Sequence, residues 1–378
     1  MSEFDFGSDP DRVLYSNPNS LNLPGQSSED LVIPGTRELM VSAQQQNMLD
    51  LPRLSNDELR VLRLSSEQAK ANYQTDIGFS PVLFSQVSLP YRKPDKDAIY
   101  WERRNGEAAL RVVPLLGKDS DGQVTRRYPF GVVPRLLVAY LTSEAKKNNS
   151  RTISLGANLN EFVQILGMGR GGQTAARLRE QLAATFGSTI EFDGLVFEDG
   201  QSVLRHGYFR FADHWDEIIN STRRDGRTPD DLSKFGWVPE VQLSERYFKE
   251  IDDRSMPIDL KVLAAIRHSA MSIDIYLWLT HKMYSLESMT RVKWSDLQFQ
   301  FGTQFERKRS FRAYFTAQLA IVQAVYPGLK VEATADFLIL RPSPTSVTIS
   351  RPRKRVVPKA LPAASTLGDV WPGDVPAS

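Results

Sequence analysis

The chain has 378 residues, of which 41% are hydrophobic, and this length suits about two domains of ordinary size. Its net charge is only +2, so a nucleic-acid-binding surface would need locally concentrated cations. The absence of cysteine excludes disulfide scaffolds, zinc fingers, iron–sulfur clusters and thiol catalysis, and indicates a reducing compartment. No stretch approaches the roughly 20 apolar residues of a membrane span. We therefore expect a cytoplasmic protein that makes no membrane contact.

The first 78 residues are expected to form a flexible arm with one short helix. Residues 1–50 are rich in Ser, Asn, Pro, Gly and Gln and contain few periodic apolar residues. A helix start at residues 55–58 then leads into a series of leucines. This leucine-bearing helix either docks on the folded body or contacts another protein. Both alternatives remain open at this point.

Residues 79–215 carry the element order of a winged-helix domain, which is helix, short strand, helix, turn, helix and hairpin. The hairpin is expected around the Asp193-Gly194 turn. Between the last two helices lies the glycine cluster 167–172, which follows a helix and lacks the lysine of a phosphate-binding P-loop. It is therefore expected to be the turn of a helix-turn-helix. The predicted elements are β segments at 82–84, 99–101 and 110–115, a helix opened by Pro134, a strand at 153–155, a helix capped by Asn158, a helix at 173–186, and strands at 189–192 and 195–197.

The second half repeats this pattern without close sequence identity. Residues 216–240 form a polar linker, and residues 241–342 form a second unit that ends in a hairpin around residues 334–336. The predicted fold class is therefore α+β, with two tandem winged-helix domains. Residues 343–378 are proline-rich with a basic run at 351–355, which predicts a disordered tail. This tail either contacts DNA phosphates or is a solvated linker.

Residues 292–325 are expected to form the helix-turn-helix that contacts DNA. Two capping patterns predict helix starts at Ser295 and Thr303, and Gly302 is expected to end the first helix in a left-handed conformation. One face of the second helix is apolar, because every third or fourth residue is large and hydrophobic. These residues are Phe311, Phe315, Leu319, Val322 and Tyr326.

The opposite face of this helix is small and basic, as a DNA recognition helix requires. Small side chains let base edges approach, and guanidinium groups reach guanine or phosphate. Cations in the first turn also oppose the helix dipole, which indicates that they serve a partner. The alternative is a core helix whose basic turns are merely solvated. The expected DNA-binding residues are Arg307, Lys308, Arg309, Ser310, Arg312, Ala313 and Thr316 in the second unit, with Arg170, Gln173 and Arg177 in the first.

The corresponding helix of the first unit, at 173–186, is expected to bind DNA more weakly. Its predicted exposed face holds Gln173, Arg177 and Ala184, with Glu180 among them, and is less basic than the face of the second unit. Part of this unit is therefore expected to serve self-association.

Five segments carry a further signal, and they are 272–279, 294–302, the helix with Phe311 and Phe315, Tyr326-Pro327 and 338–343. Together they resemble the RepA-type replication initiators of bacterial plasmids. The likeness covers most of residues 80–343 and is densest after 236. It implies binding to repeated sequences (iterons) at a plasmid origin, opening of the duplex, and recruitment of the host initiator and replicative helicase. It also implies a dimer that represses its own gene and a monomer that initiates replication.

We expect no enzymatic activity, cofactor or metal. A rolling-circle initiator would need two histidines spaced two residues apart, and the four histidines never have this spacing. The adjacent acidic pairs 230–231 and 252–253 lie in polar stretches that are typical of loops and caps. The alternative to an initiator is a winged-helix transcriptional regulator without initiation activity.

Overall fold

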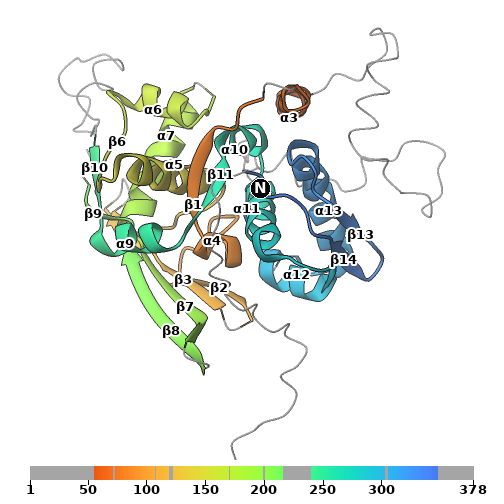
Figure 1. Cartoon of the computed structure of the whole chain (residues 1–378). Helices are drawn as coiled ribbons and strands as arrows, with labels where there is room; N and C mark the ends of the chain where they lie inside the picture. The colour runs from red at the N-terminus through yellow and green to blue at the C-terminus, as the bar shows by residue number, and fades with distance from the viewer. Residues whose placement is uncertain are drawn as a thin grey trace, which may run out of the picture.

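The computed structural model describes residues 55–70, 73–106, 108–118, 122–169, 171–198, 201–215, 240–302 and 305–347. Within them the fold is α+β, with ten helices and small antiparallel sheets (Figure 1). The predicted linker and most of the predicted arm and tail lie outside these residues. The tail was expected to begin at 343, but residues 343–347 pack on the body, where Val347 is buried and Ser346 lies within hydrogen-bonding distance of Tyr276 and Thr280.

The first half of the chain builds a four-stranded antiparallel sheet beside a group of helices. The sheet has the order β2-β3-β7-β8, and Arg111 on β3 pairs with Glu102 on β2 and Glu191 on β7. In Figure 1 the β7–β8 hairpin extends away from α5, α6 and α7. The elements are β2 (Trp101–Asn105), β3 (Ala108–Val113), the hairpin β4 (Leu115–Lys118) and β5 (Val124–Arg127), α5 (Val132–Asn148), α6 (Leu159–Ile165), α7 (Gly172–Gly187), β7 (Thr189–Glu198) and β8 (Gln201–Arg210).

Two of the predictions for this half are wrong. The hairpin does not turn at Asp193-Gly194, because β7 continues to Glu198 and pairs with β3 and β8 through Asp193. Residues 82–84 are not a strand but lead into the short helix α4 (Leu83–Gln86). The preceding strand β1 (Ile77–Pro81) ends at a proline, which lacks the N–H that a ladder needs.

Strands from distant parts of the chain join the two halves. β1 pairs with β11 (Ser255–Asp259), and β10 (Glu240–Leu243) pairs with both β6 (Thr152–Ser154) and β9 (Ala212–His214). Ser244 caps α9 (Glu245–Asp253), and Tyr247 of this helix packs against Phe209 and Phe211. The start of the predicted second unit therefore packs on elements of the first.

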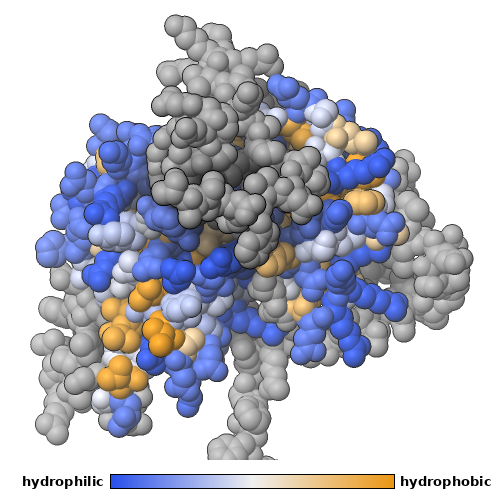
Figure 2. All heavy atoms as spheres, turned by 90° about the horizontal axis from the view of Figure 1, so that it is seen from below, coloured by the Kyte–Doolittle hydropathy of each residue, from blue (hydrophilic) through white to orange (hydrophobic). Residues whose placement is uncertain are grey.

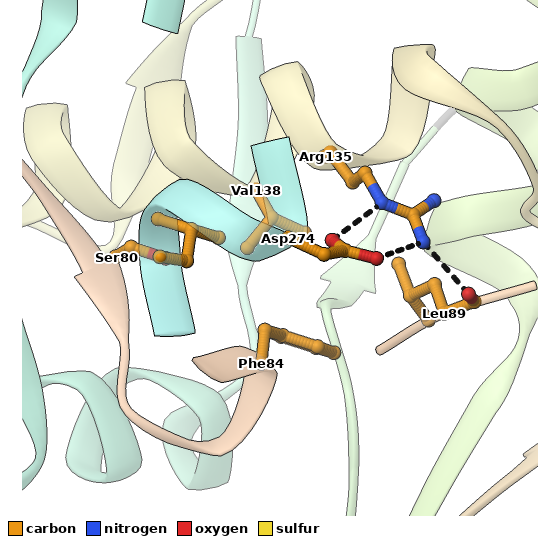
Figure 3. Close-up of a pocket in the computed structure, with 7 residues that line it drawn as sticks. Ser80, Phe84, Leu89, Arg135, Val138 and Asp274 are labelled. Carbon is orange, nitrogen blue, oxygen red and sulfur yellow. Dashed lines mark hydrogen bonds and ion pairs between the residues drawn. The ribbon is translucent and has the colours of Figure 1, made fainter. Parts of the chain in front are cut away.

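The buried helix α11 (Ala270–Ser285) is the centre of the second half. It contacts α4, α5 and α13, and its Asp274 forms a buried ion pair with Arg135 of α5 at 2.8 Å (Figure 3). The remaining elements of this half are α10 (Leu260–Ile266), β12 (Thr290–Lys293), α12 (Trp294–Phe301), α13 (Lys308–Val325), β13 (Val331–Ala333) and β14 (Phe337–Leu340).

The leucine-bearing helix α3 (Asn56–Gln68) docks on this half. Ser55 and Glu58 form the expected capping box, and Val61 and Leu64 are buried against α10 and α13. The Gln68 side-chain amide donates a hydrogen bond of 2.9 Å to the Val325 carbonyl. Of the two alternatives for this helix, the structure therefore shows docking.

Burial of two histidines predicts acid sensitivity. Burial, together with the charge of Lys282, lowers the pKa of His281 on α11 from 6.5 to about 4. Burial and the neighbouring Arg60 also lower the pKa of His268. Between pH 6.5 and 4 the unfolded chain binds protons that the folded chain does not bind. The free energy of unfolding should therefore decrease as the pH is lowered through this window.

His281→Gln should flatten this pH dependence, measured by urea unfolding at a series of pH values. His214→Gln, at an exposed position of β9, controls for the loss of a histidine. An unchanged slope in His281→Gln would show that His281 protonates equally in both states.

Candidate nucleic-acid interface

The first turn of α13 presents an exposed cluster of cations. Arg307, Lys308 and Arg309 are exposed, and within the described part of the chain they make no ion pair. We call these three residues the α13 basic cluster. The first turn contains no acidic residue, and no side chain caps its start. The cluster is therefore free to bind an anionic partner.

The two faces of α13 follow the predicted periodicity. All five predicted apolar residues are buried, whereas Arg309, Ser310, Ala313 and Ala317 are exposed and Thr316 is half-buried. The helix begins at Lys308 and not at the predicted cap Thr303, which lies outside the described residues. The first capping prediction is also wrong, because α12 begins at Trp294 with Lys293 at the cap, and Ser295 lies inside its first turn.

Aromatic packing holds α13 in place. Phe315 lies 5.5 Å from Phe301 and 5.9 Å from Trp294, measured between ring centroids. Phe301 in turn packs edge-on against Trp278 of the buried α11 at 5.6 Å. Buried aromatic pairs of this kind contribute about 0.5–1.5 kcal/mol each beyond the area that they bury. The aromatic contacts with the core thus fix the orientation of α13, and with it the outward direction of the α13 basic cluster.

Gly302 ends α12, but not in the predicted way. Its φ is −127°, so the left-handed conformation is wrong. Glycine is needed here for space, because a Cβ would lie 3.0 Å from Phe311 Cγ and closer still to Cδ2 of the same ring. The Gln298 side chain of α12 donates a hydrogen bond of 2.9 Å to the Phe305 carbonyl, which lies between α12 and α13. This bond holds the connecting segment against α12.

Arg312 is tied to the hairpin that follows α13. Its guanidinium donates a hydrogen bond of 2.9 Å to the Ala335 carbonyl and lies 5.5 Å from the Trp294 ring centroid. The indole N–H of Trp294 donates to the Thr334 carbonyl at 3.0 Å. Arg312 therefore fixes the β13–β14 turn beside the start of α13, a role that the sequence did not predict for it.

Two further cations were missed by the sequence interpretation. Arg291 and Lys293 on β12 are exposed and pair in register with Ile339 and Phe337 of β14. Because side chains alternate along a strand, both point to the same face of the β12-β14-β13 sheet. The signal that could have found them is the Arg-Val-Lys alternation. On the face drawn in Figure 2, hydrophilic side chains predominate, and hydrophobic residues lie at lower left and at upper right.

The first unit offers less than was predicted. Gln173 is exposed, Arg177 is half-buried beside Gly131, and Arg170 lies outside the described residues. Ala184 was expected on the exposed face but is fully buried. The reason is that the second half of α7 is enclosed by its neighbours, and the Gln181 side chain accepts a hydrogen bond from the Phe130 N–H at 2.8 Å.

The residues that the structure describes contain no group of three or more His, Asp and Glu side chains arranged to hold a metal ion. Among the described helices, none has the length and hydrophobicity needed to cross a bilayer.

The middle of the chain is similar to a known protein family. Residues 128–296 match the family model described as plasmid encoded RepA protein. This segment is therefore similar to a RepA_C domain. The domain begins just before α5 and ends in the first turn of α12, so it confirms the resemblance over a shorter span than predicted. The RepA_C match supports a role in plasmid replication initiation, while α13 lies beyond the matched span.

Two solved structures are similar to this chain. One is a crystal structure of selenomethionine derivatives of domains 2 and 3 of RctB, with 12% identity, a TM-score of 0.45, and coverage of 69% of this chain and 97% of that one. The other is a crystal structure of RctB domains 2–3, with 10% identity, a TM-score of 0.42, and coverage of 69% and 96%. Likeness at this level carries no argument about binding. No curated protein matches the chain.

Proposed function

We propose that this protein is a plasmid replication initiator. It would bind the double-stranded DNA of repeated sequences at the plasmid origin. In this proposal the bound protein helps to open the duplex and recruits the host initiator and replicative helicase, and it exchanges between a dimer and a monomer. The observation that carries the proposal is the RepA_C match over residues 128–296. The exposed α13 basic cluster supplies a surface suited to DNA phosphates.

We further propose that two winged-helix units, 79–215 and 241–342, make the DNA contacts. The order α11-β12-α12-α13-β13-β14, with the sheet β12-β14-β13, supports this for the second unit. The order α5-β6-α6-α7-β7-β8 supports it for the first, although β6 pairs with β10 and the β7–β8 hairpin joins β3. In this arrangement α13 would lie in a major groove and the β13–β14 hairpin would be the wing.

The proposed DNA contacts divide by location. Arg309, Ser310, Ala313 and Thr316 would face base edges, while Arg307, Lys308 and the two cations of β12 would bind phosphate. Arg312 would act mainly by holding the wing turn in place. In the first unit, Arg170, Gln173 and Arg177 would make a weaker contact one helical turn away on the DNA.

The test of this function is a footprint on the direct repeats next to the gene. An initiator should protect the repeats and make the adjacent duplex reactive to permanganate, whereas a transcriptional regulator should protect the DNA without opening it.

Binding to the repeats should weaken steeply as the salt concentration rises, because each phosphate contact releases counterions. Affinity that is flat between low and physiological salt would contradict the proposed phosphate contacts.

Arg309→Ala should distinguish base recognition from phosphate binding. We expect it to cost about 1–3 kcal/mol of affinity for the repeats and much less on scrambled DNA, because a lost base contact penalises only the correct sequence. Competition with scrambled duplex measures this difference. Arg104→Ala, which removes an exposed arginine from β2, is the matched control. Equal losses on both DNAs would assign Arg309 to phosphate alone.

A further inference from the structure

Five of the cations proposed to bind DNA, on α13 and β12, lack counterions among the described residues. The α13 basic cluster makes no ion pair there, and neither do Arg291 and Lys293 of β12. One acidic side chain, Glu306, is exposed directly before the cluster and is likewise unpaired. A surface with this excess of positive charge attracts any acidic segment that can reach it.

The sequence contains such a segment at its N-terminal end. Residues 1–54 hold eight Asp and Glu against three Lys and Arg, although the chain as a whole is slightly basic. We call this segment the acidic arm. The eight acidic residues are Glu3, Asp5, Asp9, Asp11, Glu29, Asp30, Glu38 and Asp50.

Helix α3 ties this arm to the element that carries the basic cluster. Val61 and Leu64 are buried where α3 packs on α10 and α13, and Gln68 donates its hydrogen bond to Val325 of α13 itself. α13 has 18 residues and so is about 27 Å long, whereas 54 residues can span up to roughly 180 Å. The arm can therefore reach the basic cluster within one molecule, at an effective concentration on the order of millimolar.

We propose that the acidic arm covers the α13 basic cluster in the absence of DNA and that DNA must displace it. The inference rests on the proposed function, because it assigns a competitor to the same cations. In this arrangement the arm carboxylates occupy positions that phosphates take in the complex. The arm thereby weakens the phosphate contacts with every DNA sequence to the same extent. Base contacts then contribute a larger fraction of the binding free energy.

Full-length variants test this competition without truncating the chain. One variant carries the eight arm carboxylates as amides, with Asp→Asn and Glu→Gln, and a matched control scrambles the order of residues 1–54 at constant composition. Binding is measured by fluorescence anisotropy on a labelled duplex of mixed sequence. We expect the amide variant to bind about tenfold tighter than wild type at low salt, with the difference shrinking as salt rises. The scrambled control should bind like wild type.

A direct contact is tested by zero-length carbodiimide coupling, which joins a carboxylate to a lysine amine that touches it. We expect arm peptides linked to Lys308 or Lys293, and we expect DNA to suppress these products. Links confined to Lys354 or Lys359 would overturn the proposal, because they would make the basic tail the partner of the arm. Equal affinity of wild type and the amide variant would overturn it as well.

These outcomes separate the arm from the function. If wild type and the amide variant bind DNA equally well, the inference fails and the DNA-binding proposal stands. If neither variant binds mixed-sequence or repeat DNA at low salt, the proposed function fails first. If the scrambled control matches the amide variant, a specific arm sequence and not its charge is responsible, which also overturns the proposal.

Discussion

Asp274→Ala is expected to lower the free energy of unfolding by about 3–5 kcal/mol, because it leaves the guanidinium of Arg135 buried without its counterion. Both side chains are 3% exposed, and the pair is bidentate, with two nitrogen–oxygen distances of 2.8 Å. Figure 3 shows Arg135 reaching across to Asp274 and Leu89. Arg135 also donates to the carbonyls of Leu89, Pro90 and Gly131, which cannot neutralise its charge.

A second buried arginine makes this loss more severe. Arg103 is 3% exposed and stacks on Tyr91 at 4.7 Å, while Arg135 stacks on the same ring at 4.9 Å. Without Asp274, two guanidinium groups would share one tyrosine ring, and Arg135 would lose the carboxylate that neutralises its charge. Two like charges in a medium of low dielectric constant repel strongly.

Urea unfolding of Asp274→Ala, Arg135→Leu and the double variant measures this effect. The double variant should recover much of the loss, because replacing both partners removes the uncompensated charge. Asp253→Ala, at an exposed position near the end of α9, is the control and should change stability little. A loss below about 1 kcal/mol in Asp274→Ala would mean that water reaches Arg135 and solvates it.

Gly302→Val should abolish specific DNA binding by displacing α13. Any side chain at this position would overlap the Phe311 ring, and Phe311 packs against Phe305 and Phe315. Overpacking of a core costs about 1–3 kcal/mol, and a β-branched side chain should exceed that range. The helix can relieve the overlap only by moving away from α12, which would turn the α13 basic cluster away from its direction in the native fold.

Footprinting and calorimetry together measure this effect. Gly302→Ala should show a milder defect than Gly302→Val. Gly172→Ala is the matched control, because a Cβ at Gly172 meets nothing within 4 Å. Unchanged affinity of Gly302→Val for the origin repeats would show that α13 does not read DNA, and the proposed site would then have to be moved.

The sequence predicted local features best where one residue sets the backbone. Ser55 and Asn158 each accept a hydrogen bond from the backbone N–H three residues later, as their patterns indicated. The faces of α13 were predictable because its apolar period is uninterrupted. Two Asp-Gly pairs, at 193–194 and 199–200, compete for the hairpin turn, and pairing of β7 with β3 through Asp193 excludes the first. Local turn chemistry could not contain that information.

The parts that sequence could not supply depend on partners far apart in the chain. Arg135 and Asp274 are separated by 139 positions, and each is flanked by apolar residues in its helix without a local sign of its partner. The steric need at Gly302 arises from Phe311, and only the packed turn brings the two together. The DNA-binding assignment of the α13 basic cluster remains a prediction of helix geometry.

The pairing of β1 with β11 means that β1 is synthesised long before its partner strand exists. Ile77 pairs with Asp259 and Pro81 with Ser255, so β1 leaves the ribosome about 180 residues ahead of the strand that completes its ladder. At roughly 5–20 residues per second, the wait is on the order of 10–40 s. During that time the backbone edge of β1 is open, although α5 can already be in place and offer the Ser143 hydroxyl to the Phe79 N–H. A nascent chain on a polysome, with many copies side by side, is therefore most exposed to strand exchange with its neighbours before residue 259 has been made.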